Sequence, residues 1–493
     1  MSAYTELERR FKRLDDLAGA QAQLQWDGAV MMPPGGASAR ADQLASLAGL
    51  SHELLLAPEV GELLQRAEAQ SLDPWQAANR SEMRRRWRHA TALPGSLVEA
   101  LSQAASACEM TWRQAREDDD FASLQAHLES VVALTRQAAQ AKAEAFGCAP
   151  YDALLEAYDP DTTWAQIAPI FAELEAFLPE FLAATVERQK LSPALPFEAE
   201  ISPAAQRALA PELLAALGFD FDHGRLDESH HPFTGGTADD VRLTTRYRAE
   251  DFSHALMAVL HEGGHAMYER GLPASWRGQP VGQARGMTLH ESQSLIVEMQ
   301  ACRSPEFLTW LAPELRQAFA VAGPAWQAEN LIRASHRVEA SLIRVDADEV
   351  SYPLHIILRT RLERALLADD LQVAELPGAW RDGMQALLGL TPANDRMGCL
   401  QDIHWPEGAF GYFPTYTLGA LAAAQFFAAA RAAEPGIPEA LGRGDFGPLM
   451  AWLRPHVHAL GSSLSSSEII TRATGAPLGT AAFRAHLEAR YGG

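Results

Sequence analysis

Five consecutive residues in the middle of the chain, from His261 to His265, read His-Glu-Gly-Gly-His. In a helix the two histidines stand one turn apart on the same face, so both imidazoles can bind a single metal ion. Glu262 projects about 100° round the helix axis, where it can take a proton from a water at the metal. The motif predicts a metallopeptidase centre. The alternative is a pair of core histidines whose hydrogen bonds are satisfied by neighbouring groups.

The flanking residues predict that this motif lies inside an amphipathic helix. Asp251 offers an N-cap side chain upstream, and Gly271 with Pro273 two residues later marks a C-terminal stop. Apolar residues recur between them with helical spacing: Phe252, Leu256, Val259, Leu260 and Met267. Gly263 and Gly264 each cost a helix interior about 1 kcal/mol relative to alanine. We therefore expect a substrate or a second helix to approach the motif closely.

A catalytic zinc site needs a third protein ligand and keeps one position open for water. The segment from Thr288 to Ser294 begins another apolar run, and Glu291 is our choice for this ligand. Thr288 and Glu291 also have the spacing of a capping box, in which the carboxylate would fold back on the helix start. Spacing alone favours the two interpretations equally, with His290 and Glu298 as lesser candidates.

The main strand signal precedes the motif. Apolar and polar side chains alternate from Val241 to Tyr247, which predicts a strand at the edge of a small sheet. An extended peptide could add to such an edge, with Arg242 or Arg246 available to charged groups. Alternatively, the arginines only guard an ordinary edge against aggregation. His231 lies in a predicted loop, His231 to Gly236, where it could contact substrate or belong to a surface pair with His230.

Arg344 is predicted to lie in a helical segment with Asp348 one turn later, which is the spacing of an ordinary ion pair. An exopeptidase, however, needs a fixed cation for the terminal carboxylate of its substrate, and a guanidinium binds a carboxylate bidentately. His404 and Tyr412 lie in glycine-bounded segments that could present side chains at a cleft. Either could donate a hydrogen bond to a developing oxyanion, although core packing is as good an explanation for Tyr412 and for Tyr416.

These residues and their order resemble the carboxypeptidase Taq family of metallocarboxypeptidases. The motifs that carry the resemblance are His231-Pro232-Phe233, Asp240-Val241-Arg242-Leu243-Thr244, His261 to His265, His290-Glu291-Ser292-Gln293, Ser341-Leu342-Ile343-Arg344 and Gly398-Cys399-Leu400-Gln401-Asp402-Ile403-His404-Trp405. The resemblance extends from about Trp26 to the last helix. It departs at Ala340, where we expect a proline.

The resemblance implies that Glu291 is the third metal ligand and that Arg344 binds the terminal carboxylate. It also implies zinc, replaceable by cobalt, a mostly α-helical fold with a small β-sheet beside a deep active-site groove, and a homodimer. The site residues predicted from the sequence are His261, His265 and Glu291 for the metal, Glu262, His404 and Tyr412 for catalysis, and Arg344, His231 and Arg242 for substrate.

Composition limits the partners of this 493-residue chain. A net charge of −22 and a pI near 5.2 argue against nucleic acid or an anionic membrane as a partner, because both need a basic surface. No apolar run is long enough for a membrane helix, and the N-terminus has no signal-peptide core, so we expect a cytoplasmic protein.

Four widely spaced cysteines suggest reduced, mostly buried thiols.

Helical apolar spacing over Tyr4 to Leu24, Ala39 to Ala69, Pro74 to Arg116 and Phe121 to Phe146 predicts an α-rich protein. No long linker interrupts the chain, so we expect residues 1–493 to form a single catalytic unit. Together with the metal-binding motif, the resemblance to the carboxypeptidase Taq family implies a zinc metallocarboxypeptidase that removes C-terminal amino acids from peptides. An endo-acting zinc oligopeptidase is the first alternative, and a non-catalytic helical protein with a structural metal is the second.

Overall fold

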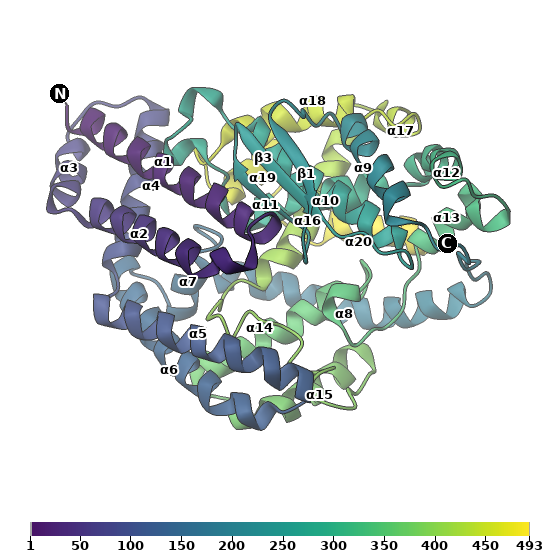
Figure 1. Cartoon of the computed structure of the whole chain (residues 1–493), viewed down its shortest axis with the longest axis horizontal. Helices are drawn as coiled ribbons and strands as arrows, with labels where there is room; N and C mark the ends of the chain where they lie inside the picture. Colours follow the sequence, from purple (N-terminus) through teal and green to yellow (C-terminus); the bar gives the residue numbers. More distant parts are fainter. Residues whose placement is uncertain (1, 493) are drawn as a thin grey trace.

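The computed structural model describes residues 2–492 and is dominated by helices, with 69% helix and 3% strand (Figure 1). Before the sheet lie α1 (Ala3–Val30), α2 (Ala37–Leu56), α3 (Pro58–Glu68), α4 (Pro74–Thr91), α5 (Gly95–Asp118), α6 (Phe121–Phe146), α7 (Pro150–Leu155), α8 (Trp164–Gln189) and α9 (Pro203–Leu217). The strands are β1 (Gly224–Glu228), β2 (Phe233–Thr237) and β3 (Asp240–Thr245). After them come α10 (Phe252–Gly271), α11 (Gly286–Leu295), α12 (Pro305–Phe319), α13 (Ala328–Ser335), α14 (Tyr352–Ala368), α15 (Leu376–Leu388), α16 (Pro414–Ala433), α17 (Ile437–Leu441), α18 (Gly447–His456), α19 (Ser466–Thr474) and α20 (Ala481–Tyr491). The predicted mainly α fold with a small sheet is confirmed.

Two of the predicted long helices are each divided in two by a proline. The segment from Ala39 to Ala69 breaks between α2 and α3. Ala57, the residue before Pro58, has a ψ of 131°, which is not helical. The segment from Pro74 to Arg116 breaks at Pro94, which caps α5 with ψ of 144°. Proline disfavours the helical conformation of the preceding residue and lacks an N–H, so a helix ends or begins there.

The sheet has the strand order β1-β3-β2, with β1 parallel and β2 antiparallel to β3. The prediction that β3 is an edge strand is therefore wrong, because both of its edges are paired. Most of the segment predicted as a loop, His231 to Gly236, belongs instead to β2, although its two glycines have low intrinsic strand propensity.

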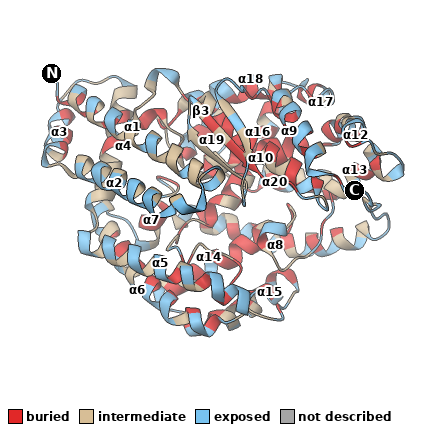
Figure 2. Cartoon of the chain, viewed as in Figure 1, coloured by how far each residue is buried: buried red, intermediate tan, exposed pale blue. Residues whose placement is uncertain are grey.

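Buried apolar side chains form three clusters, and buried residues concentrate around α10 and α16 (Figure 2). The first cluster joins α9, α10, α12 and α18, and the second joins α6, α8, α14 and α15. Helix α16 belongs to both, through Phe426 in the first and Leu418 in the second. A smaller cluster holds α1, α3 and α4 together. Side chains from the two large clusters meet where α16 passes between them.

All four cysteines are free thiols, as predicted, with Cys108, Cys302 and Cys399 buried and Cys148 exposed. Within residues 2–492, no helix combines the length and the apolar composition needed to cross a bilayer.

Candidate active site

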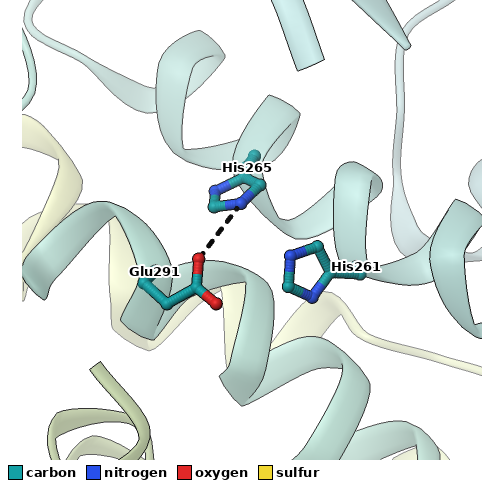
Figure 3. Close-up of side chains that lie close together, drawn as sticks. All are labelled: His261, His265 and Glu291. Atoms are coloured by element: carbon teal, nitrogen blue, oxygen red, sulfur yellow. Dashed lines mark ion pairs between the residues drawn. The ribbon is translucent and has the colours of Figure 1, made fainter. Parts of the chain in front are cut away.

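The two motif histidines lie on α10, which begins as predicted at an Asp251 cap whose side chain accepts from the His254 N–H. One ligand atom from each of His261, His265 and Glu291 lies within 4.8 Å of the others (Figure 3). Nε2 of His265 is 3.6 Å from Oε2 of Glu291, and the three side chains are 22%, 11% and 14% exposed. Two imidazoles and one carboxylate in reach of solvent form the ligand set typical of a catalytic zinc site.

Glycines let the helices that carry these residues come together. A Cβ on Gly264 would lie 2.5 Å from the carbonyl oxygen of Gln293 in α11, and a Cβ on Gly263 would meet Leu217 of α9 at 2.7 Å. On the other side of α11, a Cβ on Gly419 of α16 would lie 2.8 Å from Cβ of Glu291. The expectation that a second helix approaches the motif is confirmed, and Gly419 extends it to the third residue of the set.

The side chain of Glu291 does not cap α11. The helix begins at Gly286 with Arg285 as its N-cap, so Thr288 lies inside the first turn and cannot form the predicted capping box with Glu291. The Thr288 hydroxyl instead donates to Asp159 at 2.9 Å. The capping-box interpretation is therefore wrong. Burial raises the pKa of Glu291 despite the opposing charge of His261.

His290 lies beside this group without belonging to it. Its Nε2 is 2.9 Å from a carboxylate oxygen of Glu269, and its ring packs on that of His265 with centroids 4.5 Å apart. Burial, with the nearby His290 and His261 charges, holds the pKa of His265 well below its usual range. A neutral imidazole is the form that binds a metal.

Glu298 lies behind His261, on a π-helix, η4 (Ile296–Cys302), that continues directly from α11. Its Oε2 is 3.0 Å from Nδ1 of His261, and its Oε1 accepts from Arg303 at 2.8 Å. Burial opposes ionisation of Glu298, but His261 and Arg303 lower its pKa to about 2. A carboxylate that accepts from Nδ1 fixes the imidazole tautomer and leaves Nε2 for a metal. Glu298, weighed in the sequence as a lesser ligand candidate, is thus a partner of His261.

Glu262 is buried and faces β2. The hydroxyl of Thr234 lies 2.6 Å from its Oε2 and 3.1 Å from its backbone oxygen. Burial raises the pKa of Glu262, although the charge of His261 opposes that shift. The sequence did not point to Thr234, because it lies in a segment predicted as a loop.

Arg344 is buried and ion-paired, but with a different acid from the one the sequence suggested. Its Nε and NH2 groups bind Oδ1 of Asp402 at 2.9 and 2.8 Å, and its NH1 group donates to Tyr352 OH at 2.8 Å. Asp348 accepts instead from backbone N–H groups, among them that of Val350. The predicted pair with Asp348 is wrong, and Arg344 lies in a single 3₁₀ turn (Arg344–Asp346) where a longer helical segment was expected.

His404 and Tyr412 lie together in an aromatic group with Tyr416. The rings of His404 and Tyr412 have centroids 5.7 Å apart, and Nε2 of His404 is 3.2 Å from Tyr416 OH. The guanidinium of Arg344 lies over the Tyr416 ring at 5.2 Å. Burial and the charge of Glu291 raise the pKa of Tyr412 to about 12. Burial and the charge of Arg344 lower the pKa of His404 to about 4, so both groups are neutral hydrogen-bond donors at pH 7.

A fully buried carboxylate, Glu363 of α14, holds the loop that carries His404 and Tyr412. It accepts three hydrogen bonds, from Tyr151 OH at 2.5 Å, Trp405 Nε1 at 3.2 Å and Gly411 N at 3.3 Å. Trp405 directly follows His404, and Gly411 directly precedes Tyr412. Both ends of the loop are thereby tied to one helix. Burial raises the pKa of Glu363 to about 7.

The remaining two predicted residues lie in separate surroundings. Arg242 pairs with Asp240 at 2.7 Å and lies over the Trp26 ring at 4.6 Å. His231 is exposed, and its backbone oxygen accepts from the Ser229 hydroxyl. Within residues 2–492, neither side chain has a hydrogen bond or an ion pair to the His261, His265 and Glu291 group.

Comparisons with known proteins agree over the whole chain. A family model described as carboxypeptidase Taq (M32) metallopeptidase matches residues 6–491. Thermostable carboxypeptidase 1 of Thermus thermophilus is 39% identical over 502 residues, covering 99% of this chain and 98% of that protein. Metallocarboxypeptidase 1 of Trypanosoma cruzi has a similar solved structure, with a TM-score of 0.97, 39% identity and 99% coverage of both chains. An M32 carboxypeptidase from Deinococcus radiodurans gives a TM-score of 0.94 at 36% identity, again with 99% coverage of both chains.

Proposed function

Because the chain belongs to the carboxypeptidase Taq (M32) family of metallopeptidases, and is a metal-dependent carboxypeptidase, we propose that its metal is zinc held by His261, His265 and Glu291. The observation that carries this assignment is the convergence of three ligand atoms within 4.8 Å, with Glu262 directly following His261 on the same helix. The hydrogen bond from His261 to Glu298 supports it, since metal-binding histidines commonly donate their second nitrogen to a carboxylate. Cobalt should be able to replace zinc, since the ligands are nitrogen and oxygen.

In this proposal Glu262 is the general base. A divalent metal held by His261, His265 and Glu291 would supply Lewis acidity toward the scissile carbonyl and toward the attacking water. Glu262 takes the proton of the attacking water and passes it to the leaving amine, and its raised pKa suits a group that must both accept and return a proton. His404 and Tyr412, as neutral donors, stabilise the oxyanion that forms on the carbonyl oxygen.

Arg344 is proposed to bind the substrate's terminal carboxylate, which limits cleavage to the C-terminal residue. Asp402 already occupies its Nε edge, so the remaining N–H groups, beside Tyr352 and Tyr416, are the ones available to substrate. Being buried among aromatic rings, this cation would bind a carboxylate more strongly than an exposed arginine would. His231 and Arg242 are proposed to contact the peptide farther from the metal, across an active-site groove.

The family assignment favours exopeptidase action over the endo-acting alternative and excludes a purely structural metal. We further propose that residues 1–493 act as one catalytic unit and that the enzyme is a cytoplasmic homodimer acting on peptides. Its net charge of −22 supports the absence of nucleic-acid and anionic-membrane partners. Analytical ultracentrifugation at defined protein concentrations tests whether the enzyme is a homodimer.

The test of the proposed chemistry compares the unmodified enzyme with Glu262→Gln. Both proteins are loaded with zinc, analysed for bound metal and incubated with a mixed peptide pool whose products are followed by mass spectrometry. Glu262→Gln should retain zinc and lose activity by about 10³-fold or more, because the amide cannot accept the proton. Near-normal turnover by the zinc-loaded variant would refute Glu262 as the base, and internal cuts by the unmodified enzyme would refute exopeptidase action.

A further inference from the structure

The general base of the proposed mechanism has one side-chain partner among residues 2–492, the hydroxyl of Thr234. That hydroxyl lies 2.6 Å from Oε2 of Glu262 and 3.1 Å from its backbone oxygen. A hydroxyl carries a single proton, and the shorter contact with a carboxylate is the stronger of the two. The other oxygen, Oε1, receives no hydrogen bond from any residue in the described part of the chain, so it is the oxygen left for a water.

The strand that carries Thr234 is held against α10 at a fixed register. Thr234 pairs with Leu243 of β3, and Thr245, farther along β3, donates its hydroxyl to the Ala255 oxygen of α10. At the opposite end of α10, Arg270 donates to the Ala238 oxygen in the turn between β2 and β3 at 2.8 Å. The hairpin is thus attached to the helix on both sides of the motif.

This attachment decides which way Thr234 points. Side chains alternate between the faces of a strand, so a shift of one residue would turn Thr234 away from α10. Gly236, two residues after Thr234, maintains the tight hairpin, because it has a φ of +91° and a Cβ there would lie 2.1 Å from the Asp240 oxygen. The fold therefore presents one hydroxyl to the carboxylate of Glu262.

We propose that Thr234 is a positioning residue for the hydrolysis: its hydroxyl fixes the carboxylate of Glu262 so that Oε1 faces the attacking water. This inference rests on the proposed role of Glu262 as the base. A carboxylate on a flexible side chain has several orientations, and holding it in the productive one removes an entropic part of the barrier. Thr234 itself need not touch the substrate.

The alternative is a purely structural role, in which the Thr234 hydroxyl only attaches β2 to α10 by a hydrogen bond to the backbone oxygen of Glu262. Thr234→Val keeps the shape of the side chain and removes the hydroxyl, and with it both contacts to Glu262. The two roles are then separated by comparing kcat with melting temperature. Thr245→Val is the matched control, because it also deletes a hydroxyl that binds a backbone oxygen of α10 from the same sheet, without touching Glu262. Thr234→Ser restores the hydroxyl and removes only a methyl group.

The experiment measures kcat, KM, bound zinc and melting temperature for these variants of the full-length, zinc-loaded enzyme. Thr234→Val should lower kcat about 10- to 100-fold with KM and zinc content unchanged, and Thr234→Ser should recover most of kcat. Thr245→Val should lower the melting temperature and leave kcat unchanged. If Thr234→Val does not fold, Thr234→Ala is measured in its place.

The proposal is overturned if the folded Thr234 variant keeps kcat within about twofold of the unmodified enzyme, if Thr234→Ser is as slow as Thr234→Val, or if Thr245→Val loses kcat equally. Glu262→Gln measured in parallel separates this failure from that of the proposed function. An inactive Glu262→Gln with a fully active Thr234→Val refutes only the role of Thr234. An active Glu262→Gln refutes the base itself.

Discussion

His261 and Glu298 form a partly buried pair, with Nδ1 of the imidazole 3.0 Å from Oε2 of the carboxylate, although they are 37 residues apart. The other oxygen of Glu298 is bound by Arg303, and Arg490 of α20 donates to the Met299 oxygen, so the π-helix is fixed from both sides. His261 therefore has one ring orientation, with Nε2 directed toward His265 and Glu291. The orientation of a proposed ligand thus depends on contacts made far from it in the sequence.

Glu298→Gln should weaken zinc binding about 10-fold, and Glu298→Ala up to about 100-fold, because His261 loses the carboxylate that orients it. Competition with a chelator measures the change in affinity. Glu269→Gln is the control, since Glu269 binds His290, which only packs against the ring of His265. Equal loss in the Glu269 and Glu298 variants would mean that general disturbance of the site, and not the bond to His261, sets the affinity.

Glu291→Ala should abolish zinc retention during dialysis while the protein remains folded. Two histidines alone form an incomplete site, and α11 keeps its glycine contacts with α10 and α16 when the side chain is shortened. Metal analysis after dialysis and the circular dichroism spectrum provide the two readouts. Full zinc retention, with stability reduced by only about 1 kcal/mol, would show that Glu291 has no part in binding the metal.

The sequence predicted best those features that depend on local spacing. His261, Glu262 and His265 share one helix turn, and Asp251 caps that helix, so periodicity and capping rules were sufficient. Glu291 needed the family resemblance, because its spacing also fitted a capping box. The structure excludes the capping box, because α11 begins at Gly286 with Arg285 as its N-cap.

The contacts that the sequence missed join distant segments. Thr234 and Glu262 are 28 residues apart, and Arg344 and Asp402 are 58 apart, so no local pattern pairs them. Strand β2 lies mostly in the segment predicted as a loop, and its glycines have low strand propensity, but pairing with β3 makes it a strand. Tertiary context outweighed local preference at both places.

As the pH rises from 5 to 8, the free energy of unfolding of Glu363→Gln should increase relative to that of the unmodified enzyme. The pKa of Glu363 is raised by burial to about 7, against an ordinary value of 4.5 in the unfolded chain. Between these values the unfolded state has released a proton that the folded state still holds. The carboxyl's contribution to stability is therefore full below pH 4.5 and is lost as the pH rises through 7.

A pKa shift of this size corresponds to about 3 kcal/mol, and glutamine has no such dependence. Urea unfolding of both proteins at pH 5 and pH 8 measures the difference, and effects common to the two proteins cancel. A difference in unfolding free energy that is the same at both pH values would show that Glu363 does not titrate in this range.

Amidating the C-terminus of a peptide should slow its cleavage roughly 10- to 150-fold if Arg344 binds the terminal carboxylate. Amidation removes the charge, and one charge-assisted hydrogen-bonded contact contributes about 1.5–3 kcal/mol. Arg344→Ala should lose a comparable factor on free-acid peptides and respond little to amidation, because the binding partner is already absent. Asp402 remains paired with Arg359 at 2.6 Å in that variant, so no buried carboxylate is left without a cation. Equal rates of the unmodified enzyme on acid and amide peptides would limit Arg344 to holding Asp402 and Tyr352, and the terminal carboxylate would then need another partner.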